Sequence, residues 1–136
     1  IAKRSYDYDG IVVIHGTDTL AYTSAMLSFM LQNISIPVVV TGSQLSIANP
    51  VADALENCRC GIHMAASGYP GVFVAFNRKV ILGCRASKVR TMHLKASIIR
   101  MSEKSVLWDF ACLKKTLLRK KESLNLRQNI LIRWHF

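Results

Sequence analysis

The chain has 136 residues, a mass of 15.2 kDa, 51% hydrophobic residues and a formal net charge of +10. This length suits one domain of roughly 100–200 residues and excludes a large multidomain enzyme. With only 7 Gly and 3 Pro, collagen-like, disordered and low-complexity classes are also excluded. Because the sequence carries neither a signal peptide nor an apolar run of about 20 residues, we predict a soluble cytoplasmic protein without a membrane partner.

Three short apolar runs predict strands that are buried on both faces of a parallel sheet. These runs are Gly10–Ile14, Ile36–Thr41 and Gly71–Phe76. Between them we predict a helix from about Leu20 to Gln32, with Thr19 as its N-cap, and a second helix from Val51 to Ala66. The order β-α-β-α-β predicts an α/β fold, a three-layer parallel sheet with helices on both faces.

The first of these helices is predicted from a simple periodicity. Tyr22, Met26, Phe29 and Met30 recur at helical spacing, and Asn33 with Pro37 ends the pattern. After the third strand, residues 77–88 predict a tight turn, a returning strand and a polar loop that carries Lys88.

The basic residues gather toward the carboxyl end. Residues 95–136 hold 10 of the 18 Lys and Arg but 3 of the 8 Asp and Glu. From Arg100 onward there is no Gly or Pro, and the first part of this segment, with its Lys114-Lys115 and Arg119-Lys120-Lys121 runs, is compatible with a basic amphipathic helix. We therefore predict an α/β domain over residues 1–96 and a basic, in part helical tail over residues 97–136. Binding of polyanions through this tail is a weak alternative function, and we expect no specific nucleic-acid partner.

Ligands of open α/β sheets bind beyond the carboxyl ends of the strands. In this chain those ends are residues 15–19, 41–44 and 77–88. The first segment, His15-Gly16-Thr17-Asp18-Thr19, places hydroxyls and a carboxylate at a helix start, where backbone N–H groups favour an ionised Asp18. A hydroxyl becomes a nucleophile only when a base or a lysine activates it. An ordinary helix cap at 17–19 and a solvated surface lysine at 88 are the simpler interpretations.

The four cysteines do not indicate a metal centre. Cys58 and Cys60 form one C-x-C, whereas Cys84 and Cys112 stand alone, and this is not the paired C-x-x-C spacing of a zinc site. We predict free thiols and no bound metal.

Four blocks in the same order resemble the bacterial-type L-asparaginase family. The first runs from Asp9-Gly10 through the strand to His15–Thr19, and the second is Thr41-Gly42-Ser43-Gln44, a form typical of the type I, cytosolic branch. Asp53 with Asn57 resembles the third block, and residues 77–88 resemble the block that bears the family's catalytic lysine. The resemblance covers about residues 1–96.

The resemblance implies an activity and a set of residues. The family hydrolyses the side-chain amide of L-asparagine to L-aspartate and ammonia, with no metal and no organic cofactor, and L-glutamine stays open as a substrate. Thr17, Asp18 and Lys88 would be the catalytic residues, and Thr17, Asp18 and Ser43 would bind the substrate. In these roles Lys88 takes or shares the Thr17 proton, while Asp18 holds Lys88 and offers its carboxylate to the α-ammonium group.

The chain also departs from the family's pattern. The family's first catalytic threonine, in a Thr-Gly-Gly-Thr block, and its second domain have no counterpart in the 136 residues, so we expect an incomplete fold, truncated at the N-terminus and divergent at the C-terminus. We therefore predict little or no activity for this chain alone, and a homo-oligomer for the full-length family. A non-catalytic assembly or binding module and a related amidotransferase subunit are the alternative functions.

Overall fold

The structure is a computed structural model that describes residues 1–46, 48–49, 52–88, 99–100, 106–109 and 130–134. Within these residues the elements are, in chain order, η1 (Ala2–Arg4), β1 (Gly10–Ile14), α1 (Leu20–Met30), β2 (Pro37–Thr41), α2 (Ala54–Ala65), β3 (Gly71–Phe76), β4 (Lys79–Leu82), η2 (Gly83–Arg85), β5 (Ser87–Lys88), β6 (Ile99–Arg100), β7 (Val106–Asp109) and β8 (Ile130–Trp134). The predicted β-α-β-α-β core, from β1 to β3, is confirmed.

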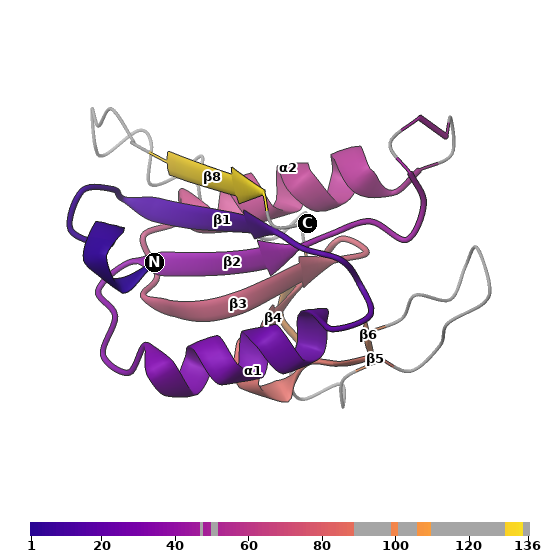
Figure 1. Cartoon of the computed structure of the whole chain (residues 1–136). Coiled ribbons are helices and arrows are strands. Elements are labelled where there is room, and N and C mark those ends of the chain that lie inside the picture. The colour runs from indigo at the N-terminus through magenta and orange to yellow at the C-terminus, as the bar shows by residue number, and fades with distance from the viewer. Residues whose placement is uncertain (47, 50–51, 89–98, 101–105, 110–129, 135–136) are drawn as a thin grey trace.

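The main sheet has the strand order β7-β4-β3-β2-β1-β8, and β5 pairs with β6 in a second, two-stranded sheet. β1, β2 and β3 run parallel, and Figure 1 shows their arrowheads on the same side of the molecule. β4 returns antiparallel to β3, so the sheet is mixed rather than wholly parallel. The return carries the chain back to β5, which lies at the carboxyl ends of the parallel strands (Figure 1).

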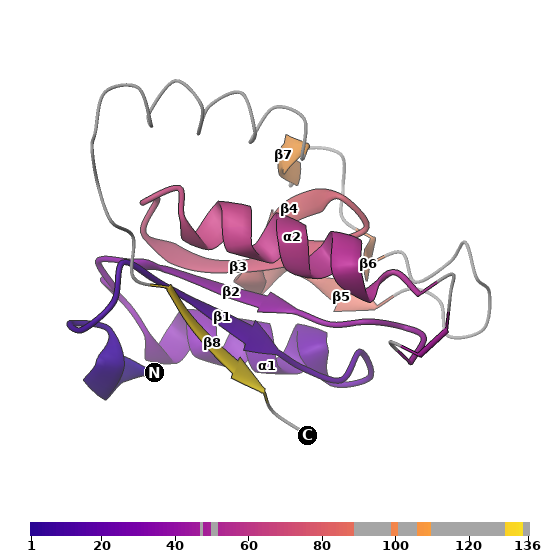
Figure 2. The ribbon, with the colours of Figure 1, turned by 90° about the horizontal axis from the view of Figure 1, so that it is seen from above.

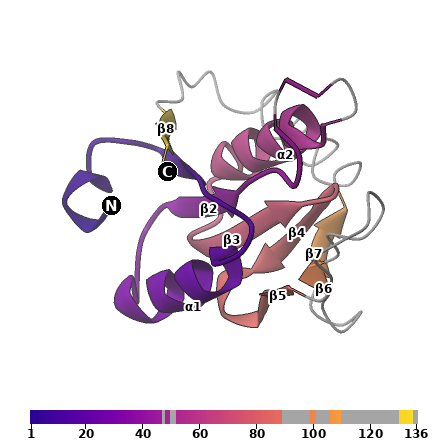
Figure 3. The same ribbon diagram turned by 45° about the vertical axis from the view of Figure 1, so that its right-hand side comes forward.

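The parallel strands are buried on both faces because alternate residues enter two separate cores. On the α1 side the core contains Ile11, Val13, Leu20, Val38, Val40, Val72, Val74, Phe76 and Ile81. On the α2 side it contains Val12, Val39, Cys60, Met64, Ala65, Phe73, Ala75 and Val80. Each fully buried Val or Ile side chain contributes about 1.5–3 kcal/mol. The prediction of helices on both faces is therefore confirmed, and the layers are visible edge-on in Figure 3.

The two crossovers have opposite handedness. β1, β2 and β3 are neighbours in this order, so both crossovers advance in the same direction across the sheet. Yet in Figure 2 α2 lies on the near face and α1 behind the sheet. With the strands pointing the same way, this makes β1-α1-β2 right-handed and β2-α2-β3 left-handed, whereas about 98% of such connections are right-handed. The left-handed crossover is what puts the start of α2 and the start of α1 on opposite sides of the strand ends.

Helix α1 has its predicted position but turns a different face outward than its apolar periodicity implies. Tyr22, Met26, Phe29 and Met30 are 60–75% exposed, while Leu20 and Ser24 are buried against the sheet. The Ser24 hydroxyl donates to the carbonyl of Gly83, 3.1 Å away, which ties α1 to the segment that leads to β5.

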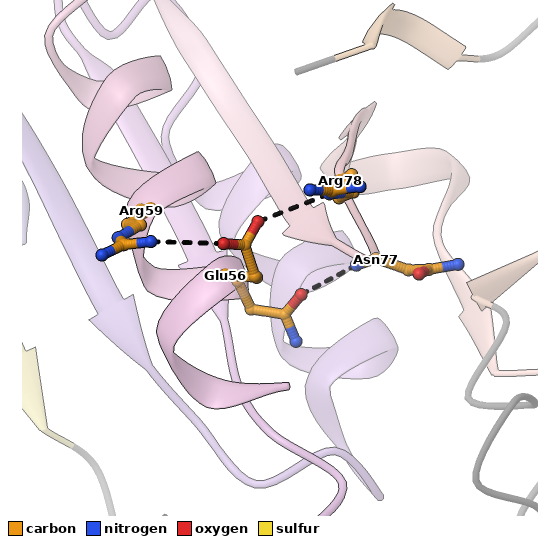
Figure 4. A network of polar contacts seen from close by, with 5 residues as sticks. Glu56, Arg59, Asn77 and Arg78 are labelled. Atoms are coloured by element: carbon orange, nitrogen blue, oxygen red, sulfur yellow. Dashed lines mark hydrogen bonds and ion pairs between the residues drawn. The ribbon is translucent and has the colours of Figure 1, made fainter. Parts of the chain in front are cut away.

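The turn between β3 and β4 is a two-residue hairpin in which Asn77 and Arg78 both have positive φ, 48° and 63°. Non-glycine residues adopt this conformation only when the surroundings hold them there. Glu56 of α2 contributes, because it pairs with Arg59 at 3.3 Å and with Arg78 at 3.4 Å (Figure 4). Such exposed ion pairs are worth little in stability, so the firmer attachment of this turn is a hydrogen bond to the Asn77 N–H, treated below.

Three strands lie in the segment that we predicted as a tail. β6 pairs with β5, β7 with β4, and β8 runs parallel to β1 at the edge of the main sheet. The helix predicted for the first part of the tail is not present at residues 106–109, which form a strand instead. Lys114-Lys115 and Arg119–Lys121 lie outside the described residues, and the domain boundary at residue 96 stays a prediction.

Candidate active site

The loops that follow β1 and β2 lie in direct contact. The His15 N–H donates to the Thr41 carbonyl at 2.8 Å. A Cβ added to Gly42 would come within 2.2 Å of the His15 carbonyl oxygen, so the two backbones approach as closely as glycine permits. The predicted site segments 15–19 and 41–44 therefore form one surface at the carboxyl ends of the strands.

Lys88 lies at the centre of this surface. Its Nζ donates to Asp18 Oδ1 at 2.5 Å and to Thr17 Oγ1 at 3.3 Å, although the two segments are some 70 residues apart. The Lys88 side chain is 16% exposed, whereas that of Asp18 is 87% exposed. The structure thus brings together the three residues that we predicted as catalytic, Thr17, Asp18 and Lys88. Their catalytic roles stay predictions.

Lys88 also acts on the ionisation of Asp18. The hydrogen bond from Lys88 and, second, its positive charge lower the pKa of the Asp18 carboxyl below its ordinary value of 3.8, while burial opposes the shift weakly. Asp18 is therefore ionised at neutral pH. Among the described residues no hydrogen bond is made to Asp18 Oδ2, so this oxygen remains available to a cation.

Replacing Lys88 by Met should return the pKa of Asp18 toward 3.8. A lowered pKa means that the ionised carboxylate stabilises the fold above its ordinary pKa, and that this contribution is lost as the pH falls through the lowered value. A pH titration of the Asp18 side-chain carbon by NMR measures the shift. Lys79→Met is the matched control, because Lys79 is exposed in β4, and equal titration curves for all three proteins would contradict the pairing.

Ser43, which we predicted to bind substrate, makes no contact with Thr17, Asp18 or Lys88 among the hydrogen bonds described for residues 41–46. Its hydroxyl is 2.6 Å from both the Leu45 carbonyl and Asp53 Oδ1. The neighbouring Gln44 reaches the cluster instead, since its Oε1 accepts from the Thr17 hydroxyl at 3.2 Å. The Thr-Gly-Ser-Gln block signalled this turn in the sequence, but not which of its side chains faces Thr17.

Two further polar residues of the site received no role from the sequence. Asp53 accepts a hydrogen bond from the Gln44 N–H at 3.1 Å, and Asn57, although polar, is only 1% exposed. Their spacing of four residues at a helix start was the available signal, because it places both side chains on one side of the helix.

His15 stabilises the turn between β1 and α1. Its Nε2 is 3.0 Å from Thr23 Oγ1 and its Nδ1 is 2.7 Å from the Gly16 carbonyl, so one ring nitrogen donates and the other accepts or donates according to the tautomer. In the part of the chain that the structure describes, no group of three or more His, Cys, Asp or Glu could hold a metal. Cys58, Cys60 and Cys84 are free thiols, and Cys112 lies outside the described residues.

None of the helices in the described residues is long and apolar enough to cross a bilayer.

Comparison with known proteins gives consistent matches to this part of the chain. A family model, the N-terminal domain of asparaginase, matches residues 1–103, past the boundary at 96 that we predicted. The L-asparaginase of Thermococcus kodakarensis is 56% identical over 90 residues, which cover 66% of this chain and 27% of the relative. L-asparaginase 1 of Escherichia coli K12 is 46% identical over 89 residues, or 63% of this chain and 26% of the relative.

One relative has a different name, that of a glutamyl-tRNA(Gln) amidotransferase subunit of T. kodakarensis. It is 46% identical over 91 residues, which cover 64% of this chain and 21% of the relative. Among solved structures, the thermostable L-asparaginase of T. kodakarensis superimposes with a TM-score of 0.67 at 53% identity and covers 70% of this chain and 29% of that chain. L-asparaginase I of Vibrio cholerae gives a TM-score of 0.62 at 40% identity, covering 66% and 28%. The chain thus spans about a quarter of the length of the relatives it matches.

Proposed function

The chain belongs to the asparaginase family, and on this premise we propose that Thr17, Asp18 and Lys88 are part of an amidohydrolase site for L-asparagine. The reaction adds water to the side-chain amide carbon and breaks its C–N bond, which yields L-aspartate and ammonia. The observation that carries the proposal is the pair of Lys88 hydrogen bonds to Thr17 and Asp18, because it joins a hydroxyl, a cation and a carboxylate in one cluster.

The three residues have distinct chemical capacities. The Lys88 ammonium beside Thr17 Oγ1 stabilises negative charge on that oxygen and can return a proton to a departing amine. Asp18 holds Lys88 through Oδ1, and its exposed carboxylate suits the α-ammonium group of an amino acid. We assign Ser43 to the substrate-binding turn through its backbone, because its hydroxyl is engaged by Leu45 and Asp53.

The proposed site is one part of a larger one. The resemblance assigns the nucleophile to a Thr-Gly-Gly-Thr block that residues 1–136 do not contain, and the chain covers 27% of its thermococcal relative. Loss of one member of a group that acts as a unit removes most of the catalysis. We therefore expect the 136-residue chain by itself to release little or no ammonia.

A graft tests the proposal. Residues 10–88 would replace the matching segment of the L-asparaginase of T. kodakarensis, a relative 56% identical over 90 residues. Because all three cluster residues lie in the graft, the chimera should release ammonia from L-asparagine within about 10-fold of the parent enzyme, a cost of about 1.4 kcal/mol in activation free energy. Coupled spectrophotometric detection of ammonia gives the rate. A chimera that folds but releases none would favour the non-catalytic binding or assembly module.

An amidotransferase subunit is the second candidate function, favoured by the 46% identity to the glutamyl-tRNA(Gln) amidotransferase subunit of T. kodakarensis. One methylene separates asparagine from glutamine, and such a difference is worth only about 1–3 kcal/mol in a pocket. The same residues 10–88 grafted into that amidotransferase discriminate the two candidates, since the amidotransferase alternative requires activity in this graft and none in the asparaginase graft. A cytoplasmic location and a homo-oligomeric state stay predictions.

A further inference from the structure

Helix α2 begins with two polar side chains that bond to each other and to the strand ends. Asn57 Nδ2 donates to Asp53 Oδ2 and to the Gly42 carbonyl, both at 2.9 Å. Asn57 Oδ1 accepts from the Asn77 N–H at 2.8 Å. An amide that is 1% exposed must satisfy its donors and acceptor within the protein, and here they join the ends of β2 and β3 to α2.

Asp53 continues this network toward the turn after β2. Its Oδ1 accepts from the Ser43 hydroxyl at 2.6 Å and from the Gln44 N–H at 3.1 Å. Asp53 occupies the N-cap position of α2, where an aspartate ordinarily accepts from the first N–H groups of its own helix, yet it makes no such bond. Helix capping therefore does not explain this carboxylate, whereas fixing residues 43–44 does.

The turn that Asp53 holds carries Gln44 to the catalytic cluster. Gln44 Oε1 accepts from the Thr17 hydroxyl at 3.2 Å, and the Thr17 oxygen accepts from Lys88 Nζ at 3.3 Å. A threonine hydroxyl has one proton and two lone pairs. When its proton points to Gln44, a lone pair is left for Lys88, so Gln44 determines the direction of the Lys88–Thr17 hydrogen bond.

We propose that Asp53 and Asn57 are positioning residues that hold Gln44 against Thr17, and that Gln44 orients the Thr17 hydroxyl so that its oxygen accepts from Lys88. The catalytic meaning of this orientation rests on the proposed function, while the orientation itself does not. Neither Asp53 nor Asn57 touches Thr17, so both act through Gln44.

An exchange of the two residues tests the proposal in the full chain. In Asp53→Asn an amide nitrogen faces another N–H whichever way the new amide turns, and in Asn57→Asp two carboxylates face each other. The double variant D53N/N57D restores a donor and an acceptor between the two positions and keeps the net charge. It also retains an acceptor for Ser43, for the Gln44 N–H and for the Asn77 N–H, and loses only the bond to Gly42.

Hydrogen exchange and NMR chemical shifts give the readouts. We expect each single variant to reduce the protection of the Gln44 N–H by at least about 10-fold and to shift the Thr17 methyl resonance. The double variant should recover protection to within about 3-fold of the wild-type chain and return the Thr17 resonance. An unshifted Thr17 in both single variants would overturn the proposal, because Asp53 and Asn57 would then serve only the stability of α2.

Gln44→Leu keeps the test decisive if either single variant fails to fold. This change removes the acceptor and should shift the Thr17 methyl resonance, and adding Asp53→Asn to it should produce no further shift there. Additive shifts would overturn the route through Gln44. Neither measurement involves asparagine or ammonia, so the positioning network and the proposed hydrolase activity can fail separately.

Discussion

Lys88→Met in the grafted asparaginase is expected to lower kcat for ammonia release by about 10²- to 10⁴-fold, the range for loss of a positioned proton donor or acceptor. The reason is geometric, since Lys88 is the residue that contacts both Thr17 and Asp18. KM should also rise, because Asp18 loses the cation that holds its carboxylate beside the substrate. Steady-state kinetics with L-asparagine, by ammonia detection, measures both constants.

Two comparisons make this expectation specific. Lys79→Met removes an exposed lysine of β4 and should leave both constants within about 2-fold, since surface changes away from the site have small effects. Thr17→Val should cost about as much as Lys88→Met, and the double variant little more than either, because residues that act as a unit are not additive. Independent, additive losses would contradict a Thr17–Lys88 pair, and a fully active Lys88→Met would exclude Lys88 from the chemistry.

The sequence predicts the framework of this site because the framework depends on local signals. The apolar run Gly10–Ile14 and its polar continuation His15–Thr19 indicate a strand end, and in an α/β sheet such ends converge. The same logic brings Lys88 into consideration, once a returning strand is recognised after β3. What the pattern cannot supply is which side chain of a turn points inward, and for this reason Ser43 was assigned to the substrate although Gln44 reaches Thr17.

Two other features depend on packing and could not be predicted. Periodicity in α1 identifies a helix, but Tyr22, Met26 and Phe29 are exposed while Ser24 faces the core and bonds to the Gly83 carbonyl. Similarly, the order β-α-β-α-β leaves open on which face each helix lies, and the usual right-handed rule would place both helices on one face. The left-handed β2-α2-β3 crossover instead brings Asp53 and Asn57 to the turn after β2, where they hold Gln44.

Gly42→Ala should destabilise the chain by about 3 kcal/mol, the upper part of the usual cost of overpacking. Its Cβ would lie 2.2 Å from the His15 carbonyl oxygen, which is backbone and cannot turn away as a side chain would. The strand ends would have to separate, and the hydrogen bond from the His15 N–H to the Thr41 carbonyl, 2.8 Å long, would be strained or lost. Urea unfolding followed by circular dichroism gives the free energy of unfolding.

Gly16→Ala is the matched control, one residue from Thr17 and on the same surface of the site. A Cβ at Gly16 meets nothing within 4 Å, and neither glycine has a positive φ, so the two substitutions differ in close contact and not in backbone conformation. The control should change stability by no more than about 0.5 kcal/mol. If both variants unfolded at the same urea concentration, the close approach of the β1 and β2 ends would not be a constraint. Thr17 and Gln44 would then need another reason to meet, because it is this approach that brings the turn after β2 within reach of the Thr17 hydroxyl.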